Sequence, residues 1–304
     1  MKLSIPKLNM RYNRQECVKN NISFMRLLVN VVVLSLNYKR AVYMNNLKKM
    51  LESQKMIINL ARTDFKKRYF GSFLGITWAF IQPLITILLF WFVFQVGFRN
   101  TPIDDVPFIL WLSCAMIPWN FFAESVQSST GSILENNFLI KKMVFKSEIL
   151  PISKVYAALF VHLFFIVFLL VMFLIYGYGF SVYYFQVFYY LAACIVLVIG
   201  LSWITSSLMV FLKDTGQVVA MLLQFGFWLT PIFYSITLIP DRFLVFYKLN
   251  PMFYITEGYR NTFIYHQWFW ESPGTLYFWV VALSLLGIGY FMFRKLKSHF
   301  ADVL

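Results

Sequence analysis

The sequence predicts an all-α integral membrane protein with six transmembrane helices. Of its 304 residues, 60% are hydrophobic and only 13% are charged, whereas about a quarter of the residues are charged in an ordinary soluble domain. The apolar residues gather in six long runs, each close to the roughly 20 residues that a helix needs to cross a bilayer. The strands of a transmembrane barrel would instead alternate polar and apolar residues over segments of about 10. The composition and the run lengths therefore favour a helical bundle in a membrane.

The stretch before the first apolar run differs from everything after it. Residues 1–43 are basic and hold only a short, interrupted apolar run. We expect them to form an extension that need not be native, with Met44 a candidate for the natural start. In residues 44–75, apolar side chains recur every three or four positions and basic side chains take the opposite face. This pattern predicts an amphipathic helix in the membrane surface, where anionic lipid attracts its basic face.

The six predicted spans form one domain over residues 76–304. They occupy residues 76–98, 108–133, 155–176, 184–212, 218–239 and 276–293. Of the 27 Lys and Arg residues, all except Arg99, Arg242, Lys248 and Arg260 lie before the first span, after the sixth span, or in the loops after the second and fourth spans. Because basic residues accumulate on the cytoplasmic side, we expect both termini in the cytoplasm. The formal net charge of +14 is then an orientation signal and requires no nucleic-acid partner.

Two ionisable residues fall within the predicted spans. Glu124 lies in the second span, where an unpaired charge is costly and usually faces a cavity or a partner. It either lines a pathway, or it lies near the cytoplasmic water interface or is a protonated, hydrogen-bonded Glu, and the sequence leaves these alternatives open. His162, in the third span, has no second metal ligand nearby, so we expect a packed or hydrogen-bonded side chain. Cys17, Cys114 and Cys194 are too far apart in sequence to suggest a zinc site or a redox pair.

Two segments between the spans do more than connect them. The loop 134–151 mixes lysines with apolar residues, which suits a short helix inserting into a partner groove. The general basic bias of cytoplasmic loops explains its lysines, but not its apolar residues. The segment 240–275 is too polar to span the membrane but is rich in aromatic residues. It forms short re-entrant helices in the outer leaflet, an interfacial aromatic belt, or both.

The order of short motifs resembles a known family of membrane permeases. Residues 62–69 read RTDFKKRY, and QPL follows at 82–84. Further pieces in the same order are PW at 118–119, NN at 136–137, LIKK at 139–142, KD at 213–214, LTPI at 229–232, LNP at 249–251 and YR at 259–260. Together they resemble the ABC-2 type permeases that export polysaccharides and polyol phosphates, such as O-antigen, capsule and teichoic acid. The resemblance covers residues 44–304.

This resemblance implies a division of labour between chains. Two copies would form a pore, and a separate ATP-binding subunit, holding ATP and magnesium, would dock on each at the cytoplasm. The sequence has no G-x-x-x-x-G-K-[ST] loop, so it lacks the amides and the lysine that cradle nucleotide phosphates. We therefore expect a transport permease of the bacterial cytoplasmic (inner) membrane that is not an enzyme and holds no cofactor or metal of its own.

The family pattern also implies roles for individual residues. Candidates for coupling to the ATP-binding subunit are Arg62, Asp64, Lys66, Arg68, Tyr69, Asn137, Lys141 and Lys142. Candidates for the channel are Trp91, Phe94, Glu124, Phe225, Trp228 and Phe233. Flat aromatic faces can guide a sugar chain, although each of these rings could equally face lipid or the core. Candidates for the outer gate are Tyr254, Tyr259 and Arg260. Asp64 stands among four basic residues, so we expect it to pair with a neighbour.

These observations favour the permease of an exporter for a lipid-linked cell-surface glycan. Two alternatives stay open: an ABC-2 permease for a drug or small lipophile, and a membrane-embedded enzyme that acts on lipid-linked sugars. The motif run at 62–84 argues against the first. The second needs acids, bases or metal-binding carboxylates that converge on one site, whereas the only adjacent acidic pair is Asp104 with Asp105.

Overall fold

The computed structural model describes residues 44, 48, 50–68, 71–98, 106–140 and 146–304, without the side chain of Ala301. The chain divides into two compact units, Met1–Lys55 and Met56–Leu304. In the first unit the described positions, 44, 48 and 50–55, are helical, and the predicted extension 1–43 lies outside the described residues. The second unit is built of helices, with no β-strand among its described residues, which confirms the all-α class.

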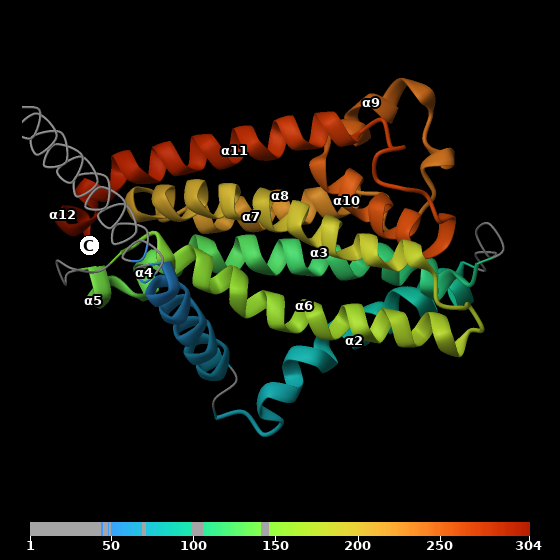
Figure 1. Ribbon diagram of the computed structural model, residues 1–304, viewed down its shortest axis with the longest axis horizontal. Helices are drawn as coiled ribbons and strands as arrows, with labels where there is room; N and C mark the ends of the chain where they lie inside the picture. The colour runs from blue at the N-terminus through green and yellow to red at the C-terminus, as the bar shows by residue number, and fades with distance from the viewer. Residues whose placement is uncertain (1–43, 45–47, 49, 69–70, 99–105, 141–145) are drawn as a thin grey trace, which may run out of the picture. The chain divides into compact units, whose positions relative to one another are not determined.

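Five helices of the second unit are long and apolar enough to cross a membrane. They occupy Gly75–Gly97, Phe108–Thr130, Ile149–Ile175, Val182–Phe211 and Thr275–His299. Each coincides with a predicted span, because the apolar runs are unbroken. The α-helices labelled in Figure 1 are α2 (Trp78–Trp91), α3 (Phe108–Thr130), α4 (Ser132–Glu135), α5 (Asn137–Ile140), α6 (Ile149–Ile175), α7 (Gln186–Phe211), α8 (Thr215–Leu229), α9 (Asp241–Leu249), α10 (Pro251–Arg260), α11 (Thr275–Leu296) and α12 (Phe300–Val303).

The remaining apolar run, 218–239, is not a continuous helix, and that prediction is wrong. α8 ends at Leu229, and Thr230 is extended with φ −93° and ψ 130°. Pro231 disfavours helical backbone at the residue before it and has no N–H to donate. A loop and a 3-10 turn at Ile236–Leu238 follow. The 15 residues of α8 extend about 22 Å, which is shorter than the roughly 30 Å hydrocarbon core of a bilayer.

α3 is the centre of the packing in the second unit. α2, α6, α7, α8 and α10 all pack against it, and most of its residues are buried. α11 packs along α7, so that α3, α6, α7 and α11 run side by side (Figure 1). An ideal Cβ on Gly289 of α11 would lie 2.4 Å from the carbonyl oxygen of Gly200 of α7, so these glycines permit a close approach. α2 and α8 leave many of their apolar side chains exposed.

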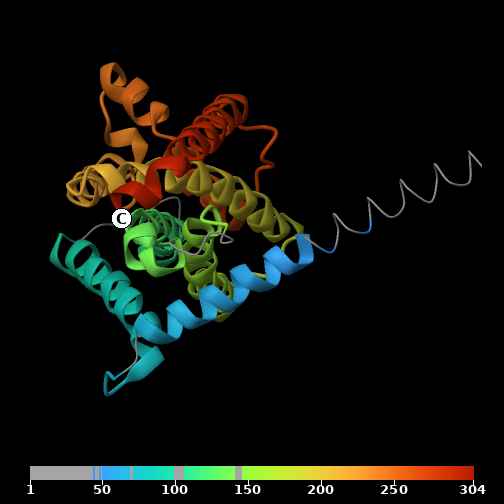
Figure 2. The same ribbon diagram turned by 90° about the vertical axis from the view of Figure 1, so that its left-hand side faces the viewer.

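The short helices gather at the two ends of the long ones. α4, α5 and α12 lie at one end, and α9 and α10 lie at the other (Figure 1). The helix of residues 56–68 runs obliquely to the long helices beside α4, and it crosses the view in Figure 2. The predicted short helices of the segment 240–275 are present as α9 and α10, followed by a π-helical turn at Asn261–Tyr265. α10 is largely buried against α3 and α7, whereas α9 has no buried residue.

Candidate functional site

Five charged side chains from four helices meet at the end of the unit that carries α4. Lys154 Nζ of α6 lies 2.5 Å from Asp64 Oδ1 and 2.6 Å from Glu135 Oε2 of α4. Arg68 pairs with Glu124 of α3 and lies 3.9 Å from Asp64, one helical turn before it. We call these five residues the ion-pair cluster. It ties the helix of residues 56–68 to α3, α4 and α6, and it confirms that Asp64 pairs with its neighbours.

Lys154 is the buried centre of the ion-pair cluster. Its side chain is 5% exposed, whereas that of Glu135 is 56% exposed. A buried ammonium group requires carboxylate partners, because an unpaired charge away from water is costly. Sequence reasoning missed this role, because it began the third span at Val155 and left Lys154 in a basic loop. α6 in fact begins at Ile149, and the apolar residues 149–152 were the signal that the helix starts earlier.

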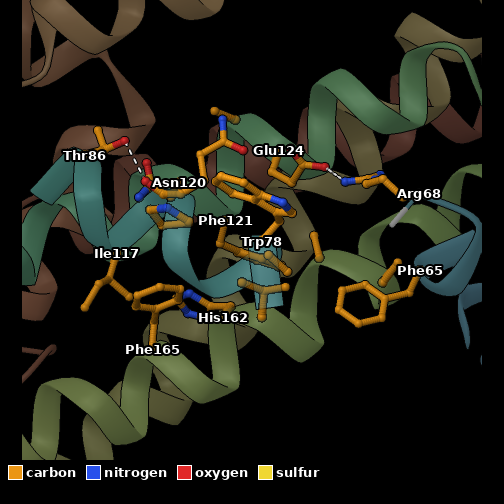
Figure 3. Close-up of a pocket in the computed structure, with 17 residues that line it drawn as sticks. Phe65, Arg68, Trp78, Thr86, Ile117, Asn120, Phe121, Glu124, His162 and Phe165 are labelled. Carbon is orange, nitrogen blue, oxygen red and sulfur yellow. Dashed lines mark hydrogen bonds and ion pairs between the residues drawn. The ribbon is translucent and has the colours of Figure 1, made fainter. Parts of the chain in front are cut away.

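A cavity of about 270 Å³ lies between α2, α3, α6 and the helix of residues 56–68. Its polar lining comes from Arg68, Gln82, Thr86, Asn120, Glu124 and His162, and aromatic rings complete the wall (Figure 3). We call it the membrane cavity. Glu124 points toward Arg68 at one side of it (Figure 3). Glu124 thus has both features that the sequence predicts for a charge within a span, a cavity and a charged partner.

His162 connects the membrane cavity to α10. Its Nε2 lies 2.9 Å from the hydroxyl oxygen of Tyr259, and its ring stacks on Phe121 with centroids 4.7 Å apart. The residue is 3% exposed. These contacts confirm the expectation of a packed, hydrogen-bonded histidine. In the part of the chain that the structure describes, no three His, Cys, Asp or Glu residues are grouped to hold a metal ion.

The channel candidates fall into two groups. Phe94, Trp228 and Phe233 form an aromatic cluster, with the ring centroids of Phe94 and Trp228 each 5.0 Å from that of Phe233. This cluster lies where the helix that contains α2 ends and where the chain leaves α8. The other three candidates, Trp91, Phe225 and Glu124, lie outside it. Phe225 is 60% exposed on α8, so it faces away from the packed interior of the unit.

The outer-gate candidates Tyr254, Tyr259 and Arg260 all lie on α10 and are buried. The Arg260 guanidinium lies 3.3 Å from the centroid of the Trp111 ring, 2.5 Å from Glu257 Oε1 and 3.0 Å from the Ile232 carbonyl oxygen. The Tyr254 hydroxyl oxygen lies 3.1 Å from those of Tyr189 and Thr275. Any movement of α10 must therefore break several polar contacts at once.

The coupling candidates are only partly brought together. Asp64 and Arg68 belong to the ion-pair cluster, whereas Arg62 and Lys66 are exposed on the same helix. Asn137 is exposed on α5, two positions after the α4 residue Glu135 in the chain. The remaining candidates, Tyr69, Lys141 and Lys142, lie outside the described residues.

A family comparison decides what kind of protein carries these features. Residues 56–264, more than half of the chain, match the model of the ABC-2 type transporter. The chain belongs to the ABC-2 type transporter family. The matched region of this ABC-2 chain contains the complete ion-pair cluster, the membrane cavity and α10, whereas α11 lies outside it.

This ABC-2 chain is similar to known permeases over nearly the whole length of those relatives. It is 28% identical over 250 residues to a protein named O-antigen export system permease protein RfbA from Klebsiella pneumoniae, covering 82% of this chain and 95% of the relative. It is 27% identical over 251 residues to a protein of the same name from Myxococcus xanthus, covering 81% of this chain and 94% of the relative. The similarity therefore includes most of the helical unit described above.

Polar contacts of this ABC-2 chain reach the membrane cavity from two sides, from α4 and from α10. Glu135 contacts Lys154, and through Asp64 and Arg68 the ion pairs continue to Glu124 at the membrane cavity. His162 lines the same cavity and contacts α10. α4 is thus linked to α6 by a direct ion pair and to the helix of residues 56–68 through Lys154.

Proposed function

We propose that this chain is the membrane permease of an ATP-driven exporter that moves a lipid-linked cell-surface polysaccharide across the bacterial cytoplasmic membrane. The observation that carries this proposal is the similarity to permeases named for O-antigen export, which covers 95% of one such relative. Export is a transport step, so the chain itself forms and breaks no covalent bond. O-antigen is the polymer that the relatives favour over capsule, teichoic acid or a small lipophile.

In the proposed topology, six segments cross the membrane and both termini lie in the cytoplasm. The sixth segment is α8 together with the extended residues that follow Leu229. The exposed apolar residues of α8, such as Met221 and Leu222, support its place in the bilayer. The amphipathic helix at residues 50–68 would then lie at the cytoplasmic surface against anionic lipid, and α9 and α10 would re-enter the outer leaflet.

Two copies of the chain would enclose the conduit, each with an ATP-binding subunit that supplies ATP and magnesium. The exposed apolar residues on α2 and α8 support contacts beyond the single chain, with lipid or with the second copy. The aromatic cluster of Phe94, Trp228 and Phe233 lies where these two helices end. Rings at that position offer apolar faces to sugar units of a passing polymer.

The ion-pair cluster supplies a mechanism for coupling. An ATP-binding subunit that contacts the α4–α5 segment would displace Glu135, and Lys154 would carry that displacement to Asp64. The helix of residues 56–68 would move with Asp64, which changes the mouth of the membrane cavity, where Phe65 and Arg68 lie. Two ion-pair contacts of a single buried ammonium thus join the docking segment to the helix at the surface.

Deletion of the gene in its native strain tests the proposed function. Lipid-linked polymer is expected to accumulate in the cytoplasm and to disappear from the cell surface, as measured by fractionation and surface labelling. A plasmid copy of the wild-type gene should restore display. Normal surface polymer in the deletion strain would contradict the proposal.

Two substitutions test the coupling mechanism in the reconstituted complex. Asn137→Ala, on α5, is expected to weaken docking of the ATP-binding subunit. Glu135→Gln keeps the side-chain size but removes its charge, so docking should persist while stimulation of ATP hydrolysis falls severalfold. Ser298→Ala, at an exposed position near the carboxyl terminus, serves as the control. Wild-type docking and stimulation in both variants would refute the mechanism.

A further inference from the structure

A second pocket, apart from the membrane cavity, lies at the end of the unit that carries α10. Its volume is about 300 Å³, at the lower limit of the range for small-ligand sites. Its polar lining comes from Trp111, Ser235, Thr237, Glu257, Asn261, Tyr265 and Gln267. We call it the outer pocket. These residues come from α3, from the loop after α8, and from α10 and the turn that follows it.

The lining of the outer pocket is rich in hydrogen-bonding groups. It offers three hydroxyls, two carboxamides, one carboxylate and one indole N–H, and no Lys or Arg is among the lining residues that the structure describes. Carboxamides both donate and accept, as hydroxyls do. A ligand that also donates and accepts at each of its polar groups, namely a polyol or a sugar, matches this inventory. A phosphate or another anion would find no cation among the described lining residues, because the nearby Arg260 is buried and already paired with Glu257, and it would face the carboxylate of Glu257.

One group in the outer pocket is buried without a partner. Trp111 is 2% exposed, and its Nε1 has no hydrogen-bond partner among the described residues. A buried N–H without an acceptor costs free energy, so a buried donor of this kind indicates a place for an external acceptor. The face of the same ring is covered by Arg260 at 3.3 Å, which leaves the edge with Nε1 as the polar part of the indole.

The other polar groups of the outer pocket differ in whether the described chain already pairs them. The hydroxyl oxygens of Ser235 and Thr237 lie 2.9 Å apart and pair with each other. Glu257 Oε1 accepts from Arg260, which fixes the carboxylate, while Oε2 has no partner within the described chain. No hydrogen bond joins the side-chain amide of Asn261 or Gln267 to another described residue, whereas the Gln267 carbonyl oxygen accepts from Gln186 Nε2 at 2.9 Å. The backbone positions both, because the Gln267 N–H donates to the Asn261 carbonyl oxygen at 3.0 Å. The two side-chain amides and Glu257 Oε2 are thus positioned by the fold without a partner in the described chain, which suits a ligand.

We propose that the outer pocket binds a neutral sugar unit of the exported polymer. Carboxamides and the carboxylate would bind ring hydroxyls, and the indole N–H would donate to a ring or hydroxyl oxygen. This inference rests on the proposed function, since it assigns the ligand from the exporter's substrate class. In the proposed topology the outer pocket faces the side to which the polymer emerges, so it would hold the leading units and oppose backward sliding.

Binding of oligosaccharide to the complete permease complex in lipid nanodiscs tests this proposal. The probe is the neutral oligosaccharide released by mild acid from the strain's own surface polymer, and a glycerol-phosphate oligomer of similar length is the charged comparison. Saturable binding of the neutral probe is expected by saturation-transfer NMR and calorimetry. The double variant Asn261→Ala with Gln267→Ala should weaken it at least tenfold, because both amides lose their bonds to hydroxyls.

The matched control is Gln217→Ala, which removes an exposed carboxamide near the start of α8, outside the lining of the outer pocket. Trp111→Phe removes the N–H donor together with part of the ring that Arg260 covers, and it should weaken binding severalfold. Unchanged affinity in the double variant, or tighter binding of the glycerol-phosphate oligomer, would overturn the proposal. A wild-type complex that exports polymer but binds no oligosaccharide would overturn the outer pocket alone. Normal surface polymer in the deletion strain would instead overturn the proposed function.

Discussion

At the scale of single residues, Lys154 links three helices, a role that its position in the sequence does not suggest. Its ammonium joins the carboxylates of Asp64 and Glu135, which lie far apart in the chain. Glu135 is 56% exposed and can be solvated without Lys154, whereas Asp64 is only 23% exposed. Loss of the ammonium therefore affects Asp64 most.

Lys154→Met should lower the free energy of unfolding by about 2 kcal/mol, because a hydrogen-bonded charge is lost beside a half-buried carboxylate. Thermal unfolding in nanodiscs should show a lower midpoint. Lys213→Met, at an exposed lysine, is the control. It should change the free energy of unfolding by no more than about 0.5 kcal/mol and leave the midpoint close to that of the wild type. Equal midpoints for both variants would show that the ion-pair cluster contributes no stability.

The contact between His162 and Tyr259 is testable as a pair. A double-mutant cycle with His162→Phe and Tyr259→Phe should give a coupling energy of about 1 kcal/mol, the usual size for a neutral buried hydrogen bond. Each single variant leaves one polar group unpaired, so the double variant should be less destabilised than the sum of the singles. Strictly additive effects on thermal stability would mean that the two side chains do not interact.

The residue scale also marks the limit of sequence reasoning. The pairing of Asp64 was predictable, because a lone carboxylate stood among basic neighbours. Its partnership with Lys154 was not, since it links residues 90 positions apart and depends on how two helices pack. The lining of the outer pocket was missed for the same reason. Ser235, Asn261 and Gln267 are unremarkable polar residues until the fold brings them together.

At the scale of elements, the contact between α7 and α11 depends on glycines, which have no side chain to hold the two helices apart. Small residues let membrane helices approach closely, so that backbone contacts replace side-chain packing. Gly289 and Gly200 meet at such a point, whereas nothing lies within 4 Å of an ideal Cβ on Gly287 of the same helix. The two glycines of α11 therefore form a matched pair for substitution.

Gly289→Ala should destabilise the protein by about 1 to 3 kcal/mol, because the added methyl group forces the two backbones apart. Gly287→Ala gains the helix propensity of alanine without a clash, so its stability should be unchanged or slightly raised. Thermal unfolding in nanodiscs compares the two variants. Similar behaviour would indicate that α7 and α11 do not meet at Gly200.

Helix prediction succeeded where apolar runs were uninterrupted and failed at a backbone signal inside a run. The first, second, fourth and sixth spans begin within two residues of their predicted starts. The run 218–239 looked equally continuous by composition, yet Pro231 stops α8 at Leu229. The start of α6 was missed for the opposite reason, since a charged residue was taken as a boundary although carboxylates neutralise it. Composition thus predicts where apolar helix is possible, and backbone chemistry decides where it ends.

At the scale of the whole molecule, the chain crosses the membrane six times if the segment that contains α8 spans the bilayer, and five times if it does not. Single cysteines at Lys213, before α8, and at Leu238, after it, would report its two ends. In a background without the three native cysteines, a membrane-impermeant thiol reagent should label Leu238→Cys from outside intact spheroplasts. Lys213→Cys should be labelled only in inside-out vesicles. Labelling of both positions from one side would show that α8 does not cross the membrane.

The packing of α3 has a consequence for how the chain enters the bilayer during synthesis. α3 is the least hydrophobic of the five long apolar helices and also the most buried, whereas α6 is the most hydrophobic. A segment enters the bilayer from the translocation machinery according to its own hydrophobicity, so α6 can partition into lipid unaided. α3 is made earlier but depends on neighbours that are made later. Its retention in the membrane would therefore be completed only when α6 and α7 arrive to surround it.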